Sequence, residues 1–132
     1  MQLAMIVQQL AVSQGWATRF DPGGDVVAEI PTRPGRTQVV TARHVADPSQ
    51  EILVYLWSPA ADASRVTDPW ALLRHSASMP YGGVVLQDGR IGIKHTLRLA
   101  GADHVELARA IFHVALAADT LESEAHGGFD AL

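Results

Sequence analysis

Histidine is the residue type in this sequence best suited to metal binding or acid–base chemistry. The chain contains six of them: His44, His75, His95, His104, His113 and His126. No two have the i, i+4 spacing that sets two imidazoles on one helix face around zinc, and no cysteine is present to complete a site. Scattered histidines that are solvated or hydrogen-bonded explain this pattern better, so we expect neither a metal nor a cofactor.

A serine nucleophile is the second possible source of chemistry, because Ser76 and Ser78 lie close to His75. A hydrolase also needs a sharp turn that exposes the serine and a base that a third group holds in place. The sequence around these serines has no G-x-S-x-G or comparable frame. We therefore expect a protein without catalytic activity. The alternative is a small enzyme or metal-dependent protein that uses His95 or His44 in a cleft.

Three arginines, Arg33, Arg36 and Arg43, surround the turn at Pro34-Gly35 and continue into the following strand. They could bind an acidic peptide, or they could keep a sheet edge solvated and so protect it from aggregation. We favour the second role, because charged residues commonly protect the edge strands of sheets.

The composition is that of an ordinary globular protein, with 132 residues of which 48% are hydrophobic and 18% charged. We expect one domain over residues 1–124 and a flexible C-terminal tail over residues 125–132. The net charge of −4 argues against a nucleic-acid partner, which would need a basic face. The absence of cysteine fits the cytoplasm. Lys94 is the only lysine beside nine arginines, which indicates a GC-rich bacterial genome.

Helical spacing and turn residues predict three helices. The first covers residues 3–14 and stops at Gly15, and the third covers residues 103–124. The second is short and begins at Pro69, with Asp68 as its N-cap. The first helix lacks a basic flank and is interrupted by glutamines, so we expect an amphipathic helix rather than a signal peptide. No apolar run approaches the roughly 20 residues of a membrane span, and we expect no contact with a membrane.

Alternating apolar residues predict five strands. Residues 25–31, 37–45 and 51–57 form a meander, and residues 83–97 form a hairpin around the type I′ turn Asp88-Gly89. The expected order is therefore α-β-β-β-α-β-β-α, an α+β fold with helices packed on a five-strand antiparallel sheet. The hairpin register sets Leu86 opposite Ile91 and Val84 opposite Ile93, pairs that we expect to face the core.

Two stretches of this chain carry a resemblance to a known family: LLRHSASMPYGGVVLQDGRIGIKHTL and ARAIFHVALAADTLE. Together with the order of elements, they resemble the class I type III secretion chaperone-like superfamily, which includes Tir-chaperone and YbjN-type domains. The resemblance implies a type III secretion chaperone-like fold and a homodimer without catalytic residues or cofactors. Secretion chaperones hold an extended effector segment on apolar patches. The alanine-rich closing helix and sparse acidic residues favour a stand-alone YbjN-like member.

The third strand of the meander is apolar on both faces, which is more than one helix layer can cover. Its second face carries Leu53, Tyr55 and Trp57, and Val39 of the neighbouring strand extends it. Apolar surface of this kind marks an interaction site, so we assign these four residues to partner binding. The alternative is that a helix covers this face.

The closing helix has an apolar stripe wider than one sheet contact needs. From it we assign Leu107, Ile111 and Val114 to a dimer interface, together with Trp70 and Leu73 of the short second helix. A simple monomeric core is the alternative. The sequence as a whole predicts a chaperone-like or regulatory protein-binding module, a homodimer that holds a protein or peptide segment on helix and sheet patches.

Overall fold

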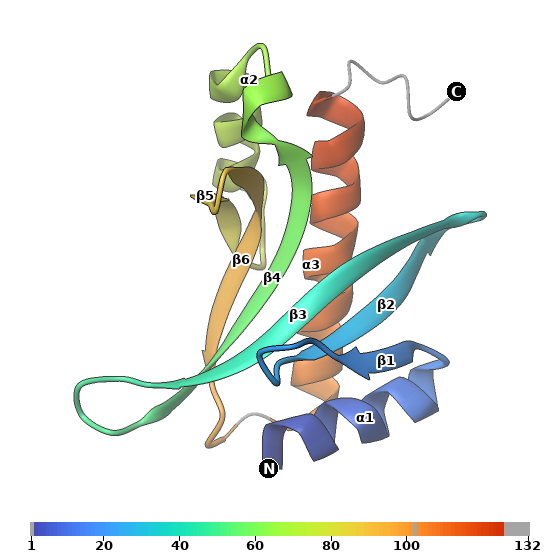
Figure 1. The fold of residues 1–132 in the computed structure, drawn as a ribbon, viewed down its shortest axis with the longest axis vertical. Helices are drawn as coiled ribbons and strands as arrows, with labels where there is room; N and C mark the ends of the chain where they lie inside the picture. The colour runs from blue at the N-terminus through green and yellow to red at the C-terminus, as the bar shows by residue number, and fades with distance from the viewer. Residues whose placement is uncertain (1, 102, 126–132) are drawn as a thin grey trace.

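The computed structural model describes residues 2–101 and 103–125, and it shows an α+β fold in which α-helices pack on an antiparallel sheet (Figure 1). The helices are α1 (Gln2–Gln14), α2 (Pro69–Arg74) and α3 (His104–Ala125), with short 3-10 turns at Ala63–Arg65 and His75–Ser78. Helix α3 extends one residue into the expected tail, and the rest of that tail, residues 126–132, lies outside the described residues.

The sheet has six strands in the described part of the chain, so the prediction of five is wrong. They are β1 (Ala17–Phe20), β2 (Val26–Arg33), β3 (Arg36–Ala46), β4 (Ile52–Asp62), β5 (Gly83–Gln87) and β6 (Arg90–Arg98). The spatial order is β1-β2-β3-β4-β6-β5, and all neighbouring pairs are antiparallel. The additional strand is β1, whose four residues are too few to show an alternating pattern.

Local signals in the sequence place the ends of several elements correctly. Gly15 has a φ of 79° and the N–H of Trp16 bonds back to the carbonyl of Ala11, the arrangement that closes a helix with glycine. Asp68 accepts a hydrogen bond from the N–H of Ala71 and so caps α2. The structure therefore confirms both boundaries. They could be predicted because each depends on residues within one turn of chain.

Strand β4 is longer than expected, because it continues through Pro59 instead of ending at Trp57. Its pairing with β3 stops at Thr41 opposite Trp57, whereas its pairing with β6 continues to Asp62. Pro59 has no N–H to donate to β3, and the side-chain amide of Gln38 donates to the Pro59 carbonyl instead, at 2.7 Å. In Figure 1 the two strands diverge beyond this point, and α3 is seen between them.

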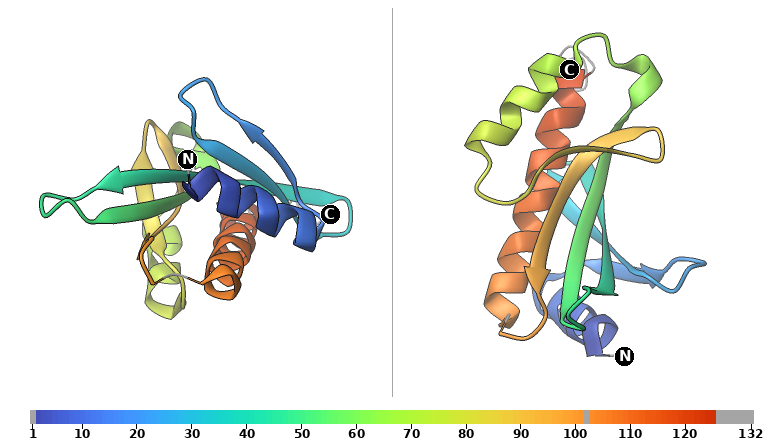
Figure 2. Two further views of the ribbon diagram at one scale, coloured as in Figure 1. Left: turned by 90° about the horizontal axis from the view of Figure 1, so that it is seen from below. Right: turned by 90° about the vertical axis from the view of Figure 1, so that its left-hand side faces the viewer.

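The core lies between the helices and one face of the sheet, here called the inner face. Its strand residues are Ala28, Ile30, Val40, Ala42, Val54, Leu56 and Ile93, all buried. Figure 2 shows α3 running along the sheet and α1 beside its N-terminal end. Helix α1 contributes Leu3, Val7 and Leu10 to the same core.

The dimer interface predicted on α3 is corrected by this packing. Leu107, Ile111 and Val114 are at most 1% exposed, because their stripe faces the inner sheet surface of the same chain. They are core residues of the protomer and are not available to a second copy. The alternative interpretation, a simple core, describes these three residues correctly.

The β5–β6 hairpin has the predicted turn and register. Asp88 and Gly89 have φ values of 51° and 75°, as a type I′ turn requires, and Leu86 pairs with Ile91. Leu86 is nevertheless 70% exposed, which contradicts its assignment to the core. The reason is its position: β5 is the last strand at this edge of the sheet.

Candidate partner-binding site

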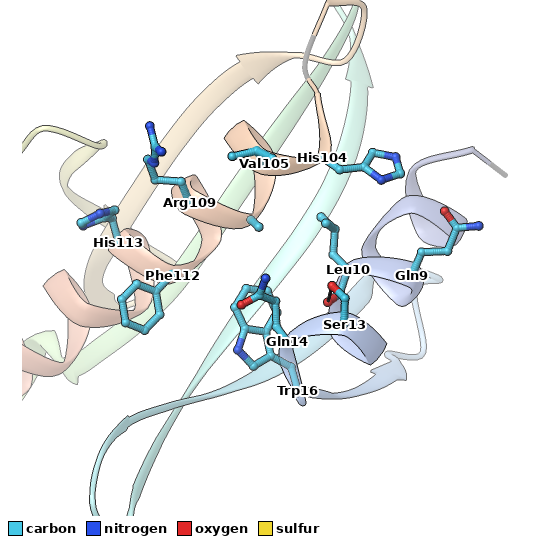
Figure 3. Close-up of a pocket in the computed structure, with 11 residues that line it drawn as sticks. Gln9, Leu10, Ser13, Gln14, Trp16, His104, Val105, Arg109, Phe112 and His113 are labelled. Atoms are coloured by element: carbon cyan, nitrogen blue, oxygen red, sulfur yellow. Dashed lines mark hydrogen bonds between the residues drawn. The ribbon is translucent and has the colours of Figure 1, made fainter.

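A groove of about 560 Å³ lies between the C-terminal half of α1 and the N-terminal half of α3 (Figure 3). Helical periodicity explains its two walls, because the lining residues of each helix recur at intervals of three to four positions. It is lined by Gln9, Leu10, Ser13, Gln14, Trp16, His104, Val105, Ala108, Arg109, Phe112 and His113.

The α3 wall of this groove exposes large apolar side chains, whereas Leu10 in the facing wall is buried and Trp16 is half-buried. On the α3 side, Val105 is 67% exposed and Phe112 is 38% exposed. On the other side lie Leu10 and Trp16, and Figure 3 shows Trp16 and Phe112 at opposite walls. The width of the apolar stripe on α3 predicts that this helix packs on the sheet and also contacts a second surface. Beside the core stripe Leu107, Ile111 and Val114, this helix carries a second apolar stripe, Val105, Ala108 and Phe112, and these three residues line the groove.

The polar groups that line the groove carry no negative charge in the part of the chain that the structure describes. Arg109, His104 and His113 are its titratable groups, and glutamines and Ser13 supply neutral polar atoms. Sequence reasoning did not identify this site, because it requires α1, Trp16 and α3 to meet. The one available signal was the width of the apolar stripe on α3, which includes Val105, Ala108 and Phe112.

The four residues predicted to bind a partner, Leu53, Tyr55, Trp57 and Val39, lie on the opposite, outer face of the sheet and are all half-buried. The described helices α1 and α3 pack on the inner face, so neither one covers them. The alternative that a helix covers this face is therefore not supported. The side chains are instead shielded in part by their neighbours within the sheet.

Two contacts show how the outer face shields its own aromatic residues. The Lys94 ammonium lies 4.0 Å from the ring centroid of Tyr55, a cation–π contact across β4 and β6. Trp57 reaches over Gly92, where an added Cβ would lie 2.8 Å from the Trp57 Cη2 and would collide with the Ser58 carbonyl oxygen. Trp57 thus has a structural role in addition to any contact with a partner.

The remaining residues assigned to a dimer contact are exposed. Trp70 and Leu73 on α2 are 71% and 45% exposed, while Leu72 turns inward and is buried. Trp70 and Leu73 thus lie on the outer side of α2. Both side chains are accessible to a second protein.

The arginines around the β2–β3 turn are bound to the protein's own carboxylates. Asp119 of α3, with a side chain 5% exposed, receives Arg33 Nε at 2.7 Å and an Arg36 Nη at 2.8 Å. Arg36 also pairs with Glu122 at 3.2 Å, and Arg43 pairs with Asp25 at 2.8 Å. The two roles considered from the sequence, binding an acidic peptide and keeping a sheet edge solvated, do not describe Arg33 and Arg36. These two arginines instead attach the β2–β3 hairpin to α3.

The histidines do not converge on a common centre. Among residues 2–101 and 103–125, no group of three or more His, Asp or Glu side chains could hold a metal ion. Strand β4 separates His44 on β3 from His95 on β6, and His44 is exposed. His126 lies outside the described residues.

His95 instead belongs to an aromatic cluster beside α3. The Tyr81 ring stacks on His113 with centroids 5.0 Å apart and meets His95 edge-on at 5.4 Å. The Tyr81 hydroxyl donates to Glu106 at 3.3 Å. Burial lowers the pKa of His95, and the nearby charge of Glu106 opposes that shift.

The serines considered as nucleophiles have structural contacts. Ser76 Oγ accepts the N–H of Val84 at 2.8 Å, and Ser78 Oγ donates to the carbonyl of His75 at 3.3 Å. Both contacts stabilise the segment between α2 and β5. They give no indication of an activated hydroxyl.

Comparison with known proteins matches no family model, and no curated protein matches the chain. The resemblance to the type III secretion chaperone-like superfamily therefore stays a prediction, based on an order of elements that the structure extends by one strand. No described helix is long and apolar enough to cross a membrane.

Proposed function

We propose that the protein is a non-catalytic binding module that holds a segment of a partner protein in the groove between α1 and α3. The observation that supports this proposal best is the exposure of Val105 and Phe112 at the edge of a cavity. Large apolar side chains beside a concave surface are typical of protein recognition sites. Trp16 in the opposite wall adds the kind of aromatic surface that contributes most to binding energy.

Two further surfaces complete this proposal. The exposed side chains of Trp70 and Leu73 would form the contact of a homodimer, as the resemblance implies. The outer sheet face around Tyr55 would extend the surface available to a partner. The proposed role is chaperone-like or regulatory, and the absence of cysteine keeps the cytoplasm as the proposed location.

An NMR titration tests the groove directly. The probe is a short amidated peptide that forms an amphipathic helix, with leucines along one face and polar residues along the other. We expect its addition to shift the backbone amide signals of Leu10, Trp16, Ala108 and Phe112. The double variant Val105→Ser, Phe112→Ser should reduce peptide binding by roughly tenfold or more, because it removes two apolar contacts.

The matched control is Val12→Ser, which removes a valine of α1 that is 85% exposed, more than Val105, and lies outside the groove. It should bind the peptide like the unmodified protein. Shifts confined to Tyr55 and Trp57 would move the binding surface to the outer sheet face. Absence of any shift would contradict the proposed function.

A further inference from the structure

The charge of the α1–α3 groove differs in sign from that of the whole chain. The chain carries a net charge of −4, yet the titratable groups that line the groove are Arg109, His104 and His113. Among the described lining residues there is no Asp or Glu. The first turn of α3, with His104 and Val105, also borders the groove, and there the helix dipole contributes positive potential.

The carboxylates nearest in sequence are already engaged by other groups. Asp103 Oδ1 accepts the N–H of Glu106 at 2.7 Å and so caps the beginning of α3. Glu106 in turn accepts the hydroxyl of Tyr81, on the side of α3 that faces β6. Neither acid is among the residues that line the groove.

Arg109 is the cation that this arrangement leaves available. Within residues 2–101 and 103–125 its side chain makes no hydrogen bond or ion pair, and this side chain is exposed. Arg33, Arg36, Arg43 and Arg98 each pair with a carboxylate of the same chain. Among the arginines without such a pair in the described part of the chain, Arg109 is the one that lines this groove. An unpaired guanidinium beside exposed apolar side chains is suited to a carboxylate that accompanies apolar anchors.

We propose that the groove selects an acidic amphipathic segment of a partner protein, with apolar side chains between Trp16 and Phe112 and a carboxylate on Arg109. The inference rests on the proposed function, because it names the chemistry of the segment held at the same site. A single arginine fits an isolated carboxylate better than a polyphosphate backbone, which requires several cations in a row. Because Arg109 is exposed, its contribution is to selectivity more than to affinity.

The test compares two amidated peptides with identical leucine positions, one with glutamates and the other with lysines on the polar face. Fluorescence anisotropy of the labelled peptides measures binding to the full chain at low salt. We expect the glutamate peptide to bind at least fivefold more tightly than the lysine peptide. Arg109→Glu should reverse that preference, since an exposed attractive pair and its repulsive replacement differ by roughly fivefold to tenfold in affinity.

The matched control is Arg74→Glu, which reverses a charge at an exposed position on α2 outside the groove lining. This variant should retain the preference for the glutamate peptide. Equal binding of both peptides that depends on Val105 and Phe112 would overturn the acidic preference and leave the groove as a binding site. Binding of neither peptide would overturn the proposed function itself.

Discussion

The two halves of α3 use charge in opposite ways. In the C-terminal half, Asp119 is buried and receives two arginines from the β2–β3 hairpin, so these charges are satisfied within the protein. In the N-terminal half, Arg109 has no ion-pair partner among the described residues and lies beside the exposed side chains of Val105 and Phe112. The comparison indicates that both halves contribute apolar residues to the core, that the charges of the C-terminal half stabilise the fold, and that the N-terminal half leaves charged and apolar surface available for binding.

Among the changes that test this comparison, Asp119→Ala should have the largest effect on the free energy of unfolding. The change removes the shared partner of Arg33 and Arg36 and leaves a polar space under the hairpin. Breaking a buried ion pair costs several kcal/mol, and the partial exposure of both arginines reduces that figure, so we expect a loss of about 2 kcal/mol. Urea unfolding measures it.

Thr120→Ala is the control for that experiment, since Thr120 is the exposed neighbour of Asp119 on the same helix. Its free energy of unfolding should remain within roughly 0.5 kcal/mol of the unmodified protein. A similarly small change for Asp119→Ala would show that the C-terminal half of α3 does not depend on its ion pairs.

A smaller effect is expected from pH at His95 of β6, which lies beside the N-terminal half of α3 through Tyr81 and His113. Burial lowers the pKa of His95 in the folded protein below the unfolded value of 6.5. At a pH between those two values, the unfolded chain binds more protons than the folded protein. The stability associated with a neutral His95 is therefore fully present above pH 6.5 and is lost as the pH falls through the folded pKa. The groups that face His95 are Tyr81 and, through Tyr81, His113 and Glu106.

The measurement is the difference in unfolding free energy between pH 7.5 and pH 5 for the unmodified protein and for His95→Gln. The variant cannot gain a proton at this position, so its stability should fall less on acidification. An identical fall in both proteins would remove His95 from the pH response of the N-terminal half.

The smallest effect on stability is expected from Val105→Ser. Val105 is 67% exposed, so its free energy of unfolding should change by no more than about 0.5 kcal/mol. Peptide binding in the groove should nevertheless weaken. A loss of stability comparable to that of Asp119→Ala would show that Val105 belongs to the fold, and the contrast between the two halves of α3 would disappear.

Several features of this protein were determined by the sequence alone. Gly15 ends α1, Asp68 and Pro69 begin α2, and Asp88-Gly89 sets the register of the β5–β6 hairpin. Each of these features is encoded within a few consecutive residues, because caps and tight turns depend on local backbone geometry. The alternating pattern of the strands likewise placed Val54 and Leu56 on the inner face.

Other features were decided by the tertiary structure, because they depend on which distant elements meet. The strand β1 exists through its pairing with β2, and β4 continues past Pro59 because β6 supplies a partner. Burial of Leu107 and exposure of Val105 follow from how α3 is rotated on the sheet, which a wide apolar stripe leaves undetermined. The groove itself appears only where α1 meets α3, since no single segment of sequence contains both of its walls.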